Sequence, residues 1–376
     1  MNTESSSSLH LPSLKIKGFR GFDHLTIPRL GRVTLLAGRN GVGKTTVLDA
    51  VRLFAARGLP SVLADLLEER EELAACLVED RSPATVPDVA ALFHGRGEDR
   101  MSRITIGPVG KDGLALEASQ PDDWTDDERE RLVRLPLGED VAALRVKYDG
   151  WSKVVPGSFL EDKRTWPLAV PLVNYRRHRP TDWPTPVWCE SLGPGVPENL
   201  ALWGGIALTD DEDFLVQALR PILDERVDRL AVVDDSGEAP PFRSNRRVIV
   251  KLSGHPRPVP LKSFGDGATR LFGAALALTH SRKGLLVIDE AENGLHYTVH
   301  EDFWRMVLNA AREGDIQVLA TTHSWDCIVG FARAATKCAH TDGALVRLEP
   351  DDGGCRAVVY SEEDLTVAAD QRIEVR

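Results

Sequence analysis

A glycine-rich segment at residues 38–45, GRNGVGKT, has the composition of a phosphate-binding loop. It matches the pattern G-x-x-x-x-G-K-[ST] at every fixed position. The glycines let backbone N–H groups wrap around a phosphate, and Lys44 adds a positive charge for the β- and γ-phosphate oxygens. The Thr45 hydroxyl is a ligand for Mg²⁺, so the loop predicts nucleoside triphosphate binding. The predicted nucleotide-binding residues of this loop are Gly38, Arg39, Asn40, Gly41, Val42, Gly43, Lys44, Thr45 and Thr46.

Two adjacent carboxylates, Asp289 and Glu290, follow the apolar run LLVI at residues 285–288. A buried strand would deliver both to the carboxyl end of a sheet, where ligands of open α/β sheets bind. Asp289 is predicted to hold Mg²⁺, directly or through water, and Glu290 to polarise an attacking water. The alternative, that both acids cap the next helix, is weakened by the phosphate loop. The adjacent glutamate favours a hydrolase over a kinase.

Two further positions could complete this chemistry. Ser263 lies in the segment KSFGDG, directly before a predicted helix, where a serine and small residues form an anion site. His323 follows residues 316–322 and at a strand end could hydrogen-bond a γ-phosphate or Glu290. A purely structural histidine is the alternative for His323. The predicted catalytic residues are Glu290, His323 and Lys44.

These residues must be held by strands that alternate with helices. The run VTLLA at residues 33–37 predicts a strand buried on both faces, and a helix over 45–56 follows the phosphate loop. After residue 260 we predict strands at 285–289 and 316–321 and helices at 267–280, 296–312 and 325–335. This alternation predicts a parallel sheet covered on both faces.

The middle of the chain is less regular. Residues 59–100 are predicted to be mixed and helical, and Thr125 to cap a short charged helix. Residues 103–106 and 114–117 alternate like a hairpin on a sheet edge. The remaining predictions are irregular structure over 151–197, a helix at 214–230 and a strand at 247–252.

Composition restricts the class of protein. The 376 residues are 42% hydrophobic, which predicts a substantial core in two domains or in one large domain with an insertion. No apolar run is long enough to span a membrane, the polar N-terminus does not resemble a secretory signal, and five cysteines without a CxxC pair indicate reduced thiols in the cytoplasm. The net charge of -11 does not favour DNA binding. Short basic runs at 176–179 and 243–247 are predicted to be solvated loops.

The segments GRNGVGKTT, SFGDG, LLVIDEAENGLH and TTHS, in this order, resemble the ABC-type ATPase heads of the RecF, SMC and OLD group, closest to its AAA family ATPases. The opening IKGFRGFDHLTI also resembles the first strands of that group. The resemblance covers about the first sixty residues and residues 260–376. It implies an α/β P-loop NTPase head with a mostly parallel core sheet, an antiparallel edge sheet and an inserted helical or irregular lid.

The resemblance also implies ATP and Mg²⁺ as cofactors, with Thr45 and Asp289 as the metal ligands. Two subunits would meet head to tail, so that the signature segment of one caps ATP on the other. The trans signature residues are Ser263, Gly265, Asp266 and Gly267, and the D-loop residues at the interface are Glu292, Asn293 and Gly294. Arg20 falls where some members of the group place a basic residue near the phosphates.

The sequence departs from the pattern of the group in three places. The signature is not LSGGQ, because Lys262, Phe264 and Asp266 replace its Leu, first Gly and Gln. The Q-loop glutamine is not identified, and Gln120 and Gln217 are candidates only by position. The interval between the phosphate loop and the carboxylates exceeds that of a transporter ATPase, and it lacks the heptads of an SMC coiled coil. After His323 we expect only a strand pair and a short helix, so no TOPRIM nuclease module is predicted.

We therefore predict four segments: a disordered tail (1–12), the N-terminal part of the ATPase head (13–58), an antiparallel subdomain with a helical or irregular insertion (59–245) and the C-terminal part of the head (246–376). The leading hypothesis is a cytoplasmic ATPase that dimerises around ATP. By analogy alone, it would regulate a separate effector, such as a nuclease, in phage defence or DNA maintenance. The alternatives are a RecF-like DNA-binding repair ATPase and a weakly hydrolysing, nucleotide-dependent scaffold. The sequence leaves the effector and its trigger open.

Overall fold

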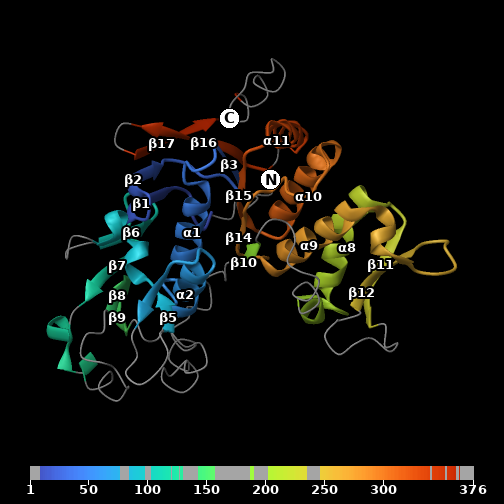
Figure 1. Ribbon diagram of the computed structural model, residues 1–376. Coiled ribbons are helices and arrows are strands. Elements are labelled where there is room, and N and C mark those ends of the chain that lie inside the picture. The colour runs from blue at the N-terminus through green and yellow to red at the C-terminus, as the bar shows by residue number, and fades with distance from the viewer. Residues whose placement is uncertain are drawn as a thin grey trace, which may run out of the picture.

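Two six-stranded sheets and one three-stranded sheet organise the larger part of the chain. The structure, a computed structural model, describes residues 9–76, 84–97, 103–119, 121–126, 128–129, 143–156, 187–189, 202–234, 246–338, 341–351, 354–360 and 364. In Figure 1 the two large sheets lie on either side of α1 (Lys44–Ala55), and further helices cover the outer face of the central sheet. The head is therefore layered, with α1 inside it.

The central sheet is mostly parallel, as predicted. Its order is β10 (Val187–Cys189), β14 (Leu285–Ile288), β15 (Gln317–Thr322), β3 (Val33–Ala37), β16 (Gly343–Asp351) and β17 (Gly354–Tyr360). The neighbours from β10 to β16 pair in parallel, and only β17 pairs with β16 in the antiparallel sense. Neither β14 nor β15 forms a hairpin with the strand beside it. Parallel neighbours need a crossover connection, which is helical here.

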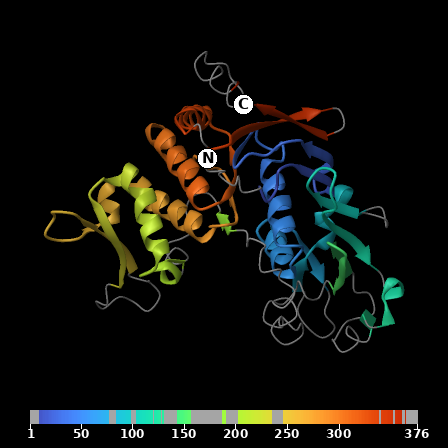
Figure 2. The same cartoon turned by 180° about the vertical axis from the view of Figure 1, so that it is seen from behind.

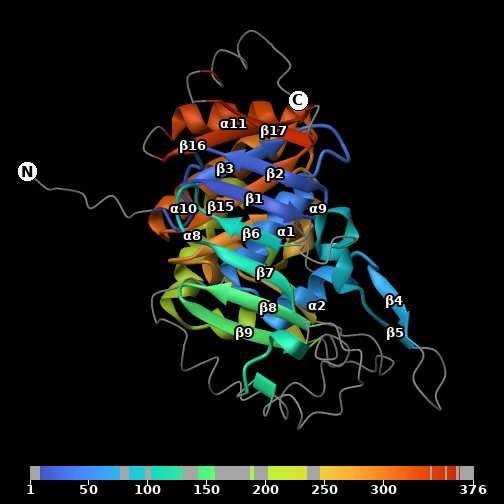
Figure 3. The same ribbon diagram turned by 90° about the vertical axis from the view of Figure 1, so that its left-hand side faces the viewer.

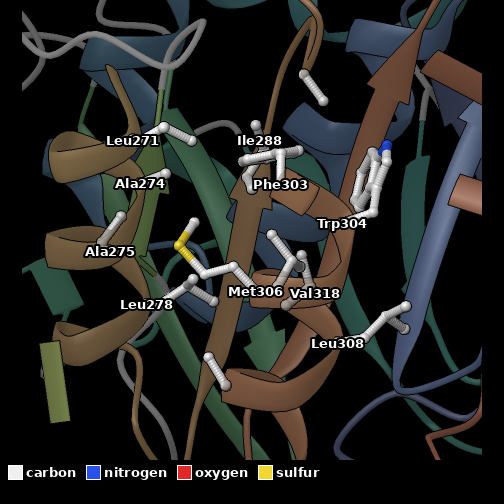
Figure 4. Packing of buried hydrophobic residues seen from close by; sticks show 14 of the residues in the cluster. Leu271, Ala274, Ala275, Leu278, Ile288, Phe303, Trp304, Met306, Leu308 and Val318 are labelled. Carbon is white, nitrogen blue, oxygen red and sulfur yellow. The ribbon is translucent and has the colours of Figure 1, made fainter. Parts of the chain in front are cut away.

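Both faces of this sheet are buried, which explains the unbroken apolar runs. Leu285 and Val287 of β14 pack on the side of α1, whereas Leu286 and Ile288 pack on the opposite side. On that opposite side lie α9 (Asp266–His280), α10 (His300–Glu313) and α11 (Trp325–Lys337). Figure 4 shows Phe303 beside Ile288 of β14, with the side chains of α9 on one side and Trp304 on the other. The prediction of a strand buried on both faces is confirmed.

The second large sheet is antiparallel throughout. Its order is β2 (Phe22–Ile27), β1 (Leu14–Phe19), β6 (Arg103–Gly107), β7 (Leu114–Ser119), β8 (Ala143–Tyr148) and β9 (Trp151–Pro156), as Figure 3 shows. The hairpin predicted near residues 103–117 exists, but it does not lie at an edge, because β6 also pairs with β1 and β7 with β8. Alternating residues reveal a strand but not its neighbours, which here come from distant parts of the chain.

Four other element predictions are corrected, one of them the irregular structure predicted over 151–197, where β9 and β10 are strands. Among the described residues of 59–100, namely 59–76 and 84–97, α2 (Pro60–Glu68) is the only α-helix, and β4 (Leu73–Cys76) pairs with β5 (Ala84–Pro87) before two short 3₁₀ turns. The helix predicted over 214–230 is α8 (Asp210–Leu223). It ends at Asp224, whose backbone is extended just after Pro221. Residues 227–234 instead form β11 (Val227–Asp234), which pairs with β12 (Arg246–Leu252), and β12 pairs with β13 (Val259–Pro260).

The helix predicted from residue 296 begins at His300, after a 3₁₀ turn over Tyr297–Val299. Seen from behind (Figure 2), α8, β11 and β12 lie at the end of the molecule opposite the antiparallel sheet. Gln120, the basic run at 176–179 and most of the predicted lid lie outside the described residues. Within the described ranges no helix has the length and apolar character needed to cross a membrane.

Candidate nucleotide-binding site

Three neighbouring parallel strands end at the same edge of the central sheet and carry the predicted chemistry. Ala37 of β3 pairs with Thr322 of β15, and Ala320 of β15 pairs with Ile288 of β14. The residues that follow these strands are therefore side by side: the phosphate loop after β3, His323 after β15 and Asp289 after β14. The structure brings together groups that lie in distant parts of the sequence.

The phosphate loop has the backbone that its glycines allow. Gly43 stands at the start of α1 with φ 102°, and a Cβ atom there would lie 2.5 Å from the Phe22 ring. Gly38 has φ 149°, and a Cβ atom there would lie 2.8 Å from the carbonyl oxygen of Leu348. Arg39 and the two residues after it are exposed at the tip of the loop. Both glycines are needed because a larger residue would displace the loop.

Lys44 bends back over this loop. Its Nζ donates to the carbonyl oxygens of Gly38 at 2.7 Å and Arg39 at 3.1 Å. Burial lowers the pKa of Lys44, and the charges of Glu292, Asp289 and Glu290, in that order, raise it again in part. The lysine of the phosphate loop therefore lies within electrostatic reach of three carboxylates from the other half of the head.

Asp289 and Glu290 are held by one hydroxyl. The Thr321 hydroxyl donates to Asp289 Oδ1 and accepts from the backbone N–H of Glu290 at 2.8 Å. Glu290 has φ 49°, a left-handed backbone that is uncommon for a side chain of this size and that clusters at functional sites. The Asn293 side chain donates to Glu290 Oε2. Both carboxylates are only half-buried, so the turn presents them to a ligand.

The oxygen groups at this edge fit the expected metal ion. Thr45, half-buried in the first turn of α1, and Asp289 supply a hydroxyl and a carboxylate, the hard ligands that Mg²⁺ prefers. Because β3 and β14 flank β15 in parallel, the first turn of α1 and the end of β14 lie at the same edge of the sheet. These two residues would hold Mg²⁺ beside the phosphates.

His323 has a different partner from the one predicted. Glu292 Oε1 accepts from the His323 backbone N–H at 2.7 Å, and it lies 2.9 Å from the imidazole Nδ1. The sequence suggested Glu290 or a phosphate as the partner of His323 and placed Glu292 only in the D-loop. No spacing rule could have revealed this pair, because its members come from two loops 31 residues apart.

The signature segment forms the start of α9. Ser263 and Lys262 are exposed on a 3₁₀ turn (Leu261–Phe264), and Gly265, with φ 96°, precedes the helix. One helical turn later, Arg270 donates to the Asn293 carbonyl oxygen at 3.0 Å. Its guanidinium also lies where a Cβ atom of Gly294 would be. Arg270 therefore joins the signature helix to the D-loop, a role that the sequence did not predict.

Arg20 is engaged away from the loop. Its guanidinium is 2.5 Å from Asp49 on α1 and 2.8 Å from Glu72, and it donates to the Leu66 carbonyl oxygen at 3.0 Å. In this structure Arg20 ties α1 to the segment after α2, and its contact with a nucleotide stays a prediction. Gln217 is exposed on α8, so neither glutamine candidate gains a role.

Family models match the two halves of the head. A model described as "AAA domain, putative AbiEii toxin, Type IV TA system" matches residues 213–327, and a model described as "AAA domain" matches residues 13–61. The chain is 21% identical over 337 residues to an ATP/GTP phosphatase of Helicobacter pylori, covering 85% of this chain and 86% of that protein. It is 35% identical over 104 residues to the DNA replication and repair protein RecF of Geobacter sulfurreducens, covering 27% of this chain and 28% of RecF.

Two solved structures of SMC heads align with the chain. An SMC head bound to the C-winged helix domain of ScpA aligns at 12% identity with a TM-score of 0.47, covering 96% of this chain and 100% of that one. The SMC head domain from Thermotoga maritima aligns at 14% identity with a TM-score of 0.45, covering 94% and 100%.

Proposed function

We propose that this chain, an ABC-type ATPase of the RecF/SMC group, binds ATP on its phosphate loop and hydrolyses it with Glu290 as the base. The observation that carries the proposal is the meeting of three strand ends. There the buried Lys44, on the loop that follows β3, and the two carboxylates, directly after β14, lie at the same edge of the sheet. A lysine with backbone N–H groups fits a polyphosphate, and a carboxylate pair fits its metal ion and its attacking water.

In the proposed reaction a water oxygen bonds to the γ-phosphorus while the bond to the β–γ bridging oxygen breaks. Glu290 takes the proton of the water, and ADP and phosphate leave. Lys44 leaves the carbonyl oxygens of its own loop and neutralises the phosphate oxygens. Bound Mg²⁺ would neutralise charge on the β- and γ-phosphates. Thr321 and Asn293 hold Glu290 in its left-handed conformation toward the water.

The binding step is tested with Lys44→Ala. We expect ATP affinity to fall at least about tenfold and hydrolysis to be lost, because the positive charge that faces the phosphates is removed. Glu301→Gln is the matched control, since Glu301 of α10 forms an ion pair with Lys337 of α11, away from the phosphate loop. Isothermal titration with ATP and phosphate release measure both steps. ATP binding by Lys44→Ala equal to that of the natural chain would remove the phosphate loop from the proposal.

The active unit is proposed to be a head-to-tail dimer around ATP. The exposure of Ser263 and Gly265 at the start of α9, and the Arg270 link from that helix to the D-loop, support it. Lys44→Ala and Ser263→Arg subunits should each be inactive alone, and their mixture should regain at most one working site per mixed dimer. A mixture as inactive as its components would contradict the dimer. Control of a separate effector, such as a nuclease, in phage defence or DNA maintenance follows only by analogy.

DNA binding is a second candidate, favoured by the outer face of the antiparallel sheet. Lys17 pairs across strands with His24, and Lys15 points to the same face, since cross-strand partners and alternate residues share a side. All three side chains are exposed. Arg103 and Lys147 lie on this face and share Glu117 at 3.3 and 2.6 Å. The lysines and the arginine of this face come from β1, β6 and β8, so the sequence showed no basic run.

The joint change Lys15→Glu and Lys17→Glu tests this face. If it binds DNA, the change should abolish a salt-dependent DNA affinity and leave ATP hydrolysis unchanged, because phosphate contacts release counterions. Lys251→Glu on β12, at the far end of the molecule, is the control. The absence of DNA binding by the natural chain at low salt, with or without ATP, would remove this candidate.

A further inference from the structure

Glu292 is a buried carboxylate two residues after the proposed base. Only 8% of its surface is exposed. Its Oε1 atom accepts a hydrogen bond from the backbone N–H of His323 at 2.7 Å and lies 2.9 Å from the imidazole Nδ1 of the same residue. The Ser324 N–H, one residue further, is taken by the Thr322 hydroxyl at 3.1 Å, which fixes the same turn from its other side. His323 is therefore held through both its backbone and its ring.

The other oxygen of Glu292 is costly to bury. Oε2 is shielded from solvent and has no hydrogen-bond partner among the described residues. An acceptor left unsatisfied in the interior destabilises a fold, whereas an amide or an apolar side chain would avoid burying a charge. Charge-assisted hydrogen bonds are also stronger in such a low-dielectric place. The carboxylate therefore directs its hydrogen bonding at His323, which suggests a role beyond stability.

The short approach favours one form of the imidazole. A hydrogen bond from Nδ1 to a carboxylate oxygen requires a hydrogen atom on Nδ1, and it leaves Nε2 for other partners. The His323 side chain remains 44% exposed, although its Nδ1 side is anchored to a side chain that is 8% exposed. The charge of Glu292 is also the largest of the three carboxylate influences on Lys44. The pair Glu292–His323 thus stands beside the phosphate loop, with Nε2 unoccupied by Glu292.

We propose that Glu292 is a positioning residue for ATP hydrolysis, which holds His323 in one tautomer and one orientation through its Oε1 atom. This inference rests on the hydrolysis proposed above. Glu290 remains the base, and Glu292 acts only through His323, in the way that a carboxylate behind a histidine orients the ring in other hydrolases. One segment, Glu290–Asn293, links the base and the histidine. Within it Asn293 donates to Glu290, and Glu292 accepts from the His323 backbone N–H.

The test compares three substitutions of Glu292 in the full chain. Glu292→Gln keeps a carbonyl oxygen that accepts from Nδ1, so most of the turnover rate is retained. Glu292→Ala and Glu292→Asp remove or withdraw that acceptor, so kcat falls at least about tenfold while the KM for ATP changes less than about threefold. Glu292→Asp keeps the charge and serves alone if the alanine variant does not fold. Glu301→Gln is again the surface control. Equal rates for the Gln and Asp variants overturn the proposal.

A double-mutant cycle with His323→Ala separates positioning from general damage. If Glu292 acts through His323, adding Glu292→Asp to His323→Ala lowers kcat by less than about twofold more. Multiplicative losses show an independent role and overturn the inference. Failure of the underlying function looks different: either the natural chain does not hydrolyse ATP, or Glu290→Gln leaves single-turnover hydrolysis undiminished.

Discussion

The buried ion pair between Arg20 and Asp49 gives a prediction that separates structure from nucleotide contact. The side chains are 5% and 3% exposed and 2.5 Å apart, whereas Arg29 and Asp342, at the same distance, are 54% and 39% exposed. Removing one partner of a buried pair costs about 3–5 kcal/mol, because the remaining charge is left uncompensated. Arg70 also lies 2.5 Å from Asp49 and still offsets part of its charge. We therefore expect Arg20→Met to lower the free energy of unfolding by about 3 kcal/mol, the lower end of this range.

Urea unfolding followed by circular dichroism measures this change. Arg29→Met is the matched control and should cost less than about 1 kcal/mol, since an exposed pair is solvated in both states. Folded Arg20→Met protein should retain its affinity for ATP, because the guanidinium contacts α1 and Glu72 and not the phosphate loop. Equal losses for the two variants would refute the reasoning from burial. Normal stability with lost ATP affinity would instead support the phosphate role predicted from the sequence.

Three further predictions concern single residues. Burial lowers the pKa of His300 from 6.5 in the folded chain, so the unfolded chain binds a proton more readily than the folded one. The contribution of neutral His300 to the free energy of unfolding is therefore complete above pH 6.5 and is lost as the pH falls through the lower pKa of the folded chain. His300→Gln should flatten this fall in urea unfolding between about pH 7.5 and 5.5, and an unchanged slope would contradict it. Burial raises the pKa of Cys327 to about 12, so a thiol reagent followed by peptide mass spectrometry should label it after Cys338 and only on unfolding. Gly43→Ala should abolish ATP binding in calorimetry while the chain stays folded, because its Cβ meets Phe22; normal affinity would show that the loop can shift.

Local sequence patterns predicted most of the elements of the head. The phosphate loop, the apolar strands β3, β14 and β15 and the carboxylates after β14 each follow from a short run of residue types, and the structure has them together. The predicted cap at Thr125 is also present, as a reciprocal pair of hydrogen bonds with Glu128. Each of these signals lies within a few residues of the feature that it predicts.

What could not be predicted depends on distant contacts. The hairpin β6–β7 lies inside its sheet because β1 and β8 flank it, and no local pattern names those neighbours. Arg270 and Glu292 have ordinary sequence surroundings, and their roles come from partners 23 and 31 residues away. The basic face of the antiparallel sheet was hidden in the same way, since its lysines and arginines come from separate strands.

The central claim is that Glu290 activates the water that attacks ATP, and single-turnover hydrolysis tests it most directly. Excess protein is mixed with ATP and Mg²⁺, and phosphate formation is followed for the natural chain and for Glu290→Gln, with ATP affinity measured for both. We expect the Gln variant to bind ATP normally and to hydrolyse it about 10²–10⁴-fold more slowly, the contribution of a positioned general base. Equal single-turnover rates would show that Glu290 is not the base.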